Sequence, residues 1–420
     1  MKEEFLHYLW KTKNVPGNNL SLTDGRKIKI NSYGQHNYDS GPDFSNASIK
    51  LDGIDWIGNI EMHIKSSDWY AHNHHLDSAY DNVILHVVYE HDKEVFVNQE
   101  VMPTLELINF IPLSHFEHYS KIISNQKWIP CLDLLKTVET FHIENQIEFA
   151  VFQRLERKVE LILQRFKELN FDLNKLIIEN TAAILGAKVN RLPMIELTQA
   201  IPTNLYFKES IENLTALIFE IANILPENSE ESYVNELKLI GEFYRKKHQL
   251  SQLNPSSWKY FGIRAPGFPP FRLAQFAVLM SNPKFFDFLV CPIEEWITWF
   301  LNEKFNLDTY WETHYHFDVS TKPHKGQISN ITKELILINV IVPIMYCWGV
   351  YQQKDSLTDN ALQILEMCTS ESNNCISNWK KNGLNPISAK DSQGLLELKN
   401  EFCDKKKCLS CKIGHQLFKQ

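Results

Sequence analysis

Apolar and polar residues alternate from position 56 to position 65, and this alternation predicts a β-strand. The polar positions of the strand are Glu61, His63 and Lys65. Because successive side chains of a strand point to opposite faces, these residues share one face of the expected sheet. Glu and Lys are common on strand faces that contact solvent, so the pattern by itself favours a solvated face.

A predicted hairpin places a further carboxylate beside this strand. Asp43 precedes a strand-like run at 44–51, and a turn at Asp52-Gly53 then leads into the strand at 56–65. Adjacent strands of such a hairpin would bring Asp43 and Glu61 to neighbouring positions.

Other segments complete the expected N-terminal sheet. Residues 2–13 have the apolar spacing of a helix, and Glu3 is expected to be solvated at the start of that helix. Strands are expected at 26–31, 83–89 and 102–109. The strand at 83–89 is nearly continuously apolar and should be buried, so His86 within it is expected to be a core histidine rather than a ligand.

The rest of the chain has helical spacing. Apolar residues recur at helical intervals from 137 to 250, and residues 284–366 continue as helices rich in aromatic side chains. Basic residues at 154–167 are most simply the polar side of an amphipathic helix, and a phosphate-contacting face is the alternative. We therefore expect an α+β protein with a mixed-sheet domain at 1–130, a helical domain at 131–260 and a second helical domain at 261–420.

Composition limits the class of protein. The chain has 420 residues, of which 44% are hydrophobic and 22% charged, and its formal net charge is −8. These values are typical of a soluble globular protein and argue against a generally basic, nucleic-acid-binding surface. They do not exclude a local basic groove. The first residues lack the apolar core of a signal peptide, and the apolar run near 334–348 is too interrupted for a membrane span. We expect a cytoplasmic protein with no membrane association.

The hairpin resembles the active-site hairpin of the PD-(D/E)xK nuclease superfamily, which has the restriction-endonuclease fold. Pro42-Asp43 matches the first half of the motif, and Glu61-Met62-His63 stands where Glu-x-Lys is expected. The resemblance covers roughly the first 110 residues. It implies that Asp43 and Glu61 bind magnesium or manganese, which would activate water against a phosphodiester. His63 takes the place of the superfamily lysine and would orient the water, or Lys65 would do so.

The loop after this strand is rich in histidine. Its candidate ligands or proton carriers are Asp68, His72, His75 and Asp77. They could form an additional site over the metal, or the histidines could be surface residues of a turn-rich loop. A different hydrolase built on His72, His74, His75 and Asp77 is a further alternative, and a site led by histidine would favour zinc or iron.

A Pro-rich loop at 262–270 precedes a predicted helix, and Arg264 and Arg272 flank it. A rigid loop at the start of a helix with two arginines could bind phosphate. The favoured alternative is a structural turn whose arginines pair with carboxylates.

The C-terminal segment has the spacing C-x4-C-x2-C-x3-H, formed by Cys403, Cys408, Cys411 and His415. This spacing is typical of a zinc site. An iron–sulfur cluster is the alternative, with a fourth cysteine from elsewhere, such as Cys131 or Cys375.

Four stretches together are similar to an uncharacterised, mostly Bacteroidetes family known as a domain of unknown function. They are GPDFSNASI, GNIEMHIKSSDWYAHNHHLDSAYDNVILHVV, FPPFRLAQ and SQGLLELKNEFCDKKKCLSCKIG. The hypothesis from sequence is a metal-dependent nuclease acting on DNA or RNA. A non-catalytic protein that binds nucleic acid or another partner through a degenerate nuclease core is the alternative.

Overall fold

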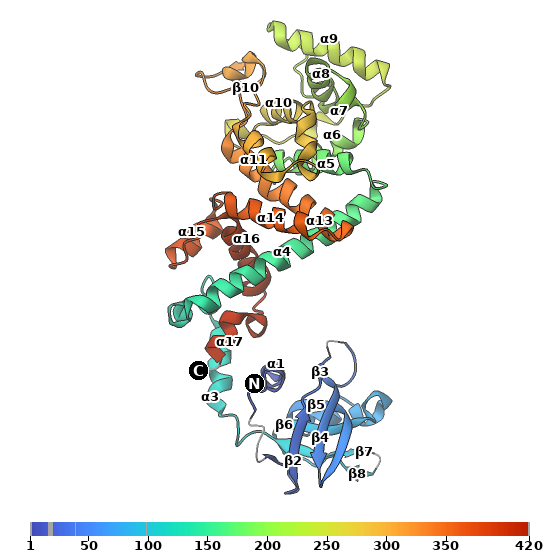
Figure 1. The fold of residues 1–420 in the computed structure, drawn as a ribbon, viewed down its shortest axis with the longest axis vertical. Coiled ribbons are helices and arrows are strands. Elements are labelled where there is room, and N and C mark those ends of the chain that lie inside the picture. Colours follow the sequence, from blue (N-terminus) through green and yellow to red (C-terminus); the bar gives the residue numbers. More distant parts are fainter. Residues whose placement is uncertain (1, 16–19, 38, 98, 419–420) are drawn as a thin grey trace. The chain divides into compact units, whose positions relative to one another are not determined.

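The computed structural model describes residues 2–15, 20–37, 39–97 and 99–418, and it divides into two compact units (Figure 1). The first unit consists of residues 1–146 and 398–420, and the second consists of residues 147–397. The boundary between them falls within α4 (Thr140–Glu168). The first unit is therefore discontinuous in sequence, because the C-terminal segment returns to it.

A mixed β-sheet forms the centre of the first unit. Its strand order is β1-β2-β4-β5-β6-β9, and β3 pairs with β4. The strands are β1 (Leu20–Ser21), β2 (Lys27–Ser32), β3 (Gln35–His36), β4 (Phe44–Leu51), β5 (Ile54–Lys65), β6 (Val83–Glu90) and β9 (Thr104–Glu106). The mixed sheet and the strands expected at 26–31, 44–51, 56–65 and 83–89 are confirmed, and only a short β9 forms within 102–109.

The direction of the strands decides where the chain must cross the sheet. β2, β4 and β5 form an antiparallel meander, whereas β6 runs parallel to β5. Parallel neighbours need a crossover connection. Residues 66–82 provide it through α2 (Asp68–Ala71), η1 (His74–Leu76) and η2 (Ser78–Tyr80). Both α2 and α1 (Glu3–Lys11) pack against β5.

This cover makes the expectation of a solvated strand face wrong. The exposed fraction is 4% for Glu61 and 1% for His63. Of these three polar residues only Lys65, at the end of β5, is exposed, with 48% of its side chain accessible. The alternation in β5 places polar side chains beneath the crossover rather than in solvent.

The C-terminal segment packs on the N-terminal helix. It contains a π-helical turn η9 (Leu398–Cys403), η10 (Cys408–Ser410) and α17 (Lys412–Phe418). Phe5 of α1 stacks on Tyr119 of α3 (Leu113–Ser124) at 4.7 Å between ring centroids, and Phe418 approaches both rings. The remaining elements of this unit are the small pair β7 (Phe96–Val97) and β8 (Glu100–Val101) and the 3-10 turn η3 (Leu132–Thr137).

The second unit is mostly helical, as expected. After α4 come α5 (Leu173–Leu185), α6 (Arg191–Ala200), α7 (Leu205–Lys208), α8 (Ile211–Ala222), α9 (Ser232–Lys247), α10 (Pro269–Met280), α11 (Ile293–Asn302), α12 (Asn330–Ile336), α13 (Val342–Gln352), α14 (Asp355–Met367), α15 (Asn374–Lys381) and α16 (Ala389–Glu397). A two-stranded pair, β10 (His314–His316) and β11 (Val319–Ser320), interrupts the helices. A buried apolar core extends through these helices from Val151 to Ala389.

One helix in the described part of the chain, Asn330–Gln352, is long and apolar enough to cross a membrane by length and composition. It consists of α12, the π-helical turn η8 (Leu337–Ile341) and α13. Of its most apolar window, 61% is buried inside the protein. Such burial is typical of the core helix of a soluble protein.

Candidate metal centre

Three elements of the first unit bring ionisable side chains to one place. β5 contributes Glu61 and His63, and β6 contributes His86, which is opposite Glu61 in the parallel register. The crossover between these strands contributes His72 and His74. The crossover lies over the strand face that carries His63. Its histidines, which do not belong to a strand, therefore meet His63 there.

The imidazoles of His63, His72 and His74 converge. Their ligand nitrogens all lie within 4.8 Å of one another, and Nε2 of His63 is 3.1 Å from Nδ1 of His72. Tetrahedral zinc at about 2.0 Å from each nitrogen requires ligand atoms a little over 3 Å apart. The observed separation therefore suits two ligands of one ion as well as it suits a hydrogen bond.

A carboxylate completes this group. Oε1 of Glu61 lies 3.2 Å from Nε2 of His74 and 3.7 Å from Nε2 of His63. Burial and the neighbouring Asp43 raise the pKa of Glu61 to about 9. A buried carboxylate that is costly to ionise alone becomes favourable when a cation binds beside it. The surroundings of Glu61 therefore fit a metal ligand.

His86 orients His63 from behind. Nδ1 of His63 is 2.8 Å from Nε2 of His86, and the Nδ1 atom of His86 is buried. Burial lowers the pKa of His63 to about 2 and that of His86 to about 3. Both rings are thus neutral, and we assign the proton between them to Nδ1 of His63, which leaves its Nε2 free to bind metal. Histidine ligands are commonly held by such an outer hydrogen bond. His86 is thus buried in the core and outside the group of three converging imidazoles, as expected, and it also contacts His63 of that group.

Asp43 and two side chains of α1 border the cluster. The backbone N–H of Asp43 donates to Oε2 of Glu61 at 3.1 Å, and Oδ2 of Asp43 accepts from the N–H of Met62 at 2.9 Å. Nε2 of His7 lies 3.2 Å from the same Asp43 oxygen. The structure thus brings Asp43, Glu61 and His63 together, as the hairpin pattern predicts.

Glu3 also faces this border. Burial raises the pKa of Glu3 to about 7, with His7 opposing the shift and Asp43 and Asp68 adding to it. The expectation of a solvated helix start was wrong for Glu3, because α1 packs against β5. For His7, burial lowers the pKa but the bond to Asp43 outweighs it, so the net shift is upward.

Several predicted site residues lie elsewhere. Lys65 pairs with Glu90 at 3.6 Å, and both side chains are about half exposed. Asp68 accepts a bond from the backbone N–H of Lys65, and Asp77 caps η2 by accepting from the N–H of Ala79. His75 is exposed and packs against Tyr70. In this loop His72 and His74 join the metal group, whereas His75, Asp68 and Asp77 do not.

The two arginines of the Pro-rich loop differ from each other. Arg264 is exposed, and Arg272 donates to Gln275 at 2.8 Å and to Thr332 at 3.4 Å. Burial lowers the pKa of Arg272, and no described carboxylate forms an ion pair with it. The pairing of both arginines with carboxylates was therefore wrong for Arg272, which links α10 to α12.

The C-terminal residues lie in the first unit. Cys403, Cys408 and Cys411 are free thiols there, and burial raises the pKa of each. Nε2 of His415 is 2.7 Å from the carbonyl oxygen of Leu409.

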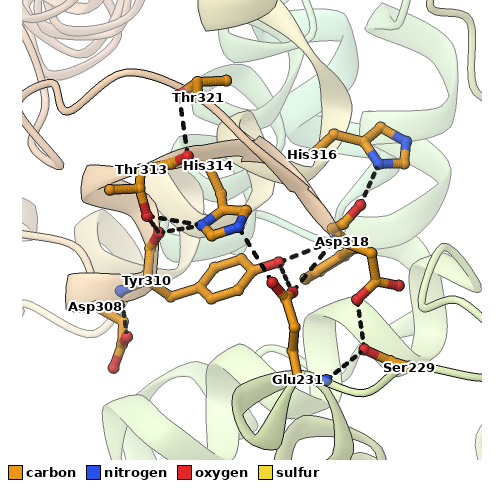
Figure 2. A network of polar contacts seen from close by, with 10 residues as sticks. Ser229, Glu231, Asp308, Tyr310, Thr313, His314, His316, Asp318 and Thr321 are labelled. Atoms are coloured by element: carbon orange, nitrogen blue, oxygen red, sulfur yellow. Dashed lines mark hydrogen bonds and ion pairs between the residues drawn. The ribbon is translucent and has the colours of Figure 1, made fainter.

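A polar network in the second unit was not found from the sequence (Figure 2). Glu231, just before α9, accepts a short hydrogen bond from the hydroxyl of Tyr310 and lies 3.2 Å from Nε2 of His314. The His314 ring stacks on Tyr310 at 4.0 Å, and the N–H of Asp318 donates to both Glu231 and Tyr310. The network fastens the β10–β11 pair to the start of α9. Glu231 and Tyr310 are 79 positions apart in the sequence, so no local pattern links them.

The fold and the cluster define a protein with a mixed sheet and a histidine- and carboxylate-rich group that could hold a metal ion. A family model described as "Protein of unknown function (DUF2851)" matches residues 3–374, and the chain belongs to this family. The matched region contains the whole histidine cluster and ends before Cys403. No curated protein and no solved structure matches the chain.

Proposed function

We propose that this protein is a metal-dependent hydrolase that cleaves phosphodiester bonds in DNA or RNA in the cytoplasm. The observation that carries the proposal is the convergence of His63, His72 and His74, with Glu61 in contact with two of these rings. Three imidazoles and one carboxylate favour zinc, iron or manganese over magnesium, which prefers oxygen ligands. The bound ion would polarise a phosphoryl oxygen and lower the pKa of a water molecule.

The chain supplies groups for proton transfer beside this centre. Glu3 has a pKa raised by burial to about 7, which is the range in which a carboxyl both accepts and releases a proton at neutral pH. Asp43 holds His7 by their 3.2 Å contact, so His7 has a fixed orientation. We assign Glu3 or His7 the proton-carrying role and Asp43 a positioning role.

The choice of phosphodiester rests on the resemblance of the hairpin to the PD-(D/E)xK nucleases. The antiparallel meander β2-β4-β5 followed by the parallel strand β6 supports it, as does the contact between Asp43 and Glu61. A second candidate, a non-catalytic binding protein, is favoured by His63. A buried neutral imidazole in the lysine position cannot supply the positive charge that a lysine offers to a transition state.

The test compares two histidines of one loop. His72→Ala should lower the transition-metal content of the purified chain, whereas His75→Ala should leave it unchanged. Both side chains are exposed, so neither change should disturb folding. Metal is measured by plasma mass spectrometry after dialysis, and cleavage of single- and double-stranded DNA and RNA is measured with manganese, zinc and magnesium. Equal metal content in the two variants would refute the metal centre. Metal binding without cleavage of any of these substrates would favour the binding protein.

A further inference from the structure

Four cysteines from two distant parts of the sequence meet in the first unit. Cys131 precedes η3, Cys403 ends η9, Cys408 begins η10 and Cys411 precedes α17. Beyond the effect of burial, Cys131, Cys408 and Cys411 all lie near enough to Cys403 to raise the pKa of its thiol, and Cys131 and Cys411 likewise raise that of Cys408. Cys408 and Cys411 are buried, and all four are free of disulfides.

Independent contacts hold the two parts of the sequence together. The Nζ atom of Lys399 lies over the ring of Trp128 at 5.4 Å from its centroid. The backbone N–H of Lys412 donates to Oε1 of Gln146 at 2.8 Å. The segments at 128–146 and 399–412 are thus fixed against each other on both sides of the thiols.

Two backbone N–H groups approach the sulfur of Cys411. The N–H groups of Ile413 and Gly414 both donate to the Cys411 sulfur. A Cβ atom at Gly414 would lie 2.0 Å from the carbonyl oxygen of Cys408, so only glycine allows this close turn. These two donors oppose the upward shift that burial gives the pKa of the Cys411 thiol, although burial outweighs them.

The spacing of the sulfurs distinguishes the metal. Among the described residues, the histidine group is the only one with three ligand atoms all within 4.8 Å of one another. No three of the four sulfurs are therefore that close to one another. Zinc with sulfur at about 2.3 Å would require sulfurs less than about 4 Å apart. In a four-iron cluster the iron and sulfide core lies between the ligands, so the thiolates stand farther apart than around a single zinc ion.

We propose that Cys131, Cys403, Cys408 and Cys411 hold a four-iron, four-sulfide cluster that joins the two sequence segments of the first unit. The cluster links the two sequence segments of the first unit, because one ligand precedes residues 147–397 and three follow them. His415 and Cys375 are not ligands. Nε2 of His415 meets a backbone carbonyl, and Cys375 belongs to the second unit.

The test begins with the wild-type chain purified without oxygen. Iron and acid-labile sulfide should each reach about four atoms per chain, and Mössbauer spectra of protein enriched in the appropriate iron isotope should show a four-iron cluster. About one zinc per chain with no sulfide would overturn the proposal. This measurement needs no variant, so misfolding cannot obscure it.

Variants then identify the ligands. Cys131→Ser should lose most of the sulfide, whereas Cys375→Ser and His415→Gln should retain it. Full sulfide content in Cys131→Ser would overturn the assignment of this ligand. His72→Ala should leave sulfide unchanged even where it loses its own metal, so the two sites fail or succeed separately.

Discussion

Replacing Glu61 by Gln isolates the cost of burying one carboxyl. Burial and Asp43 raise the pKa of Glu61 to about 9 in the metal-free protein, whereas its ordinary value is 4.5. The unfolded chain releases this proton near the ordinary value, and the folded chain keeps it until the raised value. The stabilising contribution is therefore complete below pH 4.5 and is lost as the pH rises to about 9.

The expected slope follows from this linkage. Metal-free wild type should lose about 1.4 kcal/mol of unfolding free energy per pH unit through Glu61, which is about 2 to 3 kcal/mol between about pH 7 and pH 9. Most histidines are neutral in this window. Glu61→Gln should remove this loss, because the amide does not titrate. Bound metal should also remove it in wild type, because it holds Glu61 ionised.

The slope of unfolding free energy against pH is measured by urea unfolding in the presence of a chelator. Hydrogen exchange of the β5 amides is the signal, because it reports on the first unit. Glu90→Gln is the matched control, since Glu90 is a half-exposed carboxyl on the neighbouring strand β6. It should keep the wild-type slope. The same slope in Glu61→Gln and wild type would refute the assignment of a protonated, buried Glu61.

Three further changes test other parts of the structure. Burial lowers the pKa of Lys158 to about 7. The buried charge of Lys158 destabilises the folded chain fully below about pH 7, and this cost disappears as the pH rises toward the pKa of the unfolded chain. Lys158→Met should therefore stabilise the chain at neutral pH and remove a rise in stability between about pH 7 and pH 10. Glu397, only 2% exposed, pairs with Arg154 and Arg157, and Glu397→Ala should cost about 3 kcal/mol in urea unfolding because both guanidinium groups lose their bonds to this buried carboxylate. His63→Lys should abolish metal binding, measured by isothermal calorimetry, because an ammonium group cannot coordinate; retained affinity would remove His63 from the ligand set.

Local sequence patterns were sufficient to predict the main strands of the sheet and the pairing of Asp43 with Glu61. Alternation identified β5, and the turn at Asp52-Gly53 fixed the hairpin that pairs Asp43 with Glu61. Both signals act over few residues, which is why sequence reveals them. The burial of Glu61 depends instead on packing by α1 and α2, and no local pattern reports that cover.

The histidine loop shows where local pattern fails. His72, His74 and His75 are close in sequence, and composition alone cannot rank them. Asn73 adopts a left-handed conformation, with φ of 61°, in the turn between α2 and η1. This turn directs His74 toward Glu61 and leaves His75 against Tyr70. A backbone angle at one residue therefore decides which imidazole joins the metal group.

The position of His63 indicates how this site departs from the nucleases that its hairpin resembles. A lysine there would have little solvent to keep its charge, because His63 is 1% exposed and lies among three other imidazoles, and Glu61 beside it has a raised pKa. Such surroundings favour a neutral ligand over a cation. Lys65 does not supply the missing charge, because it is paired with Glu90. In the proposed function, positive charge at this centre comes from a bound ion, and His63, His72 and His74 are the groups that would hold it.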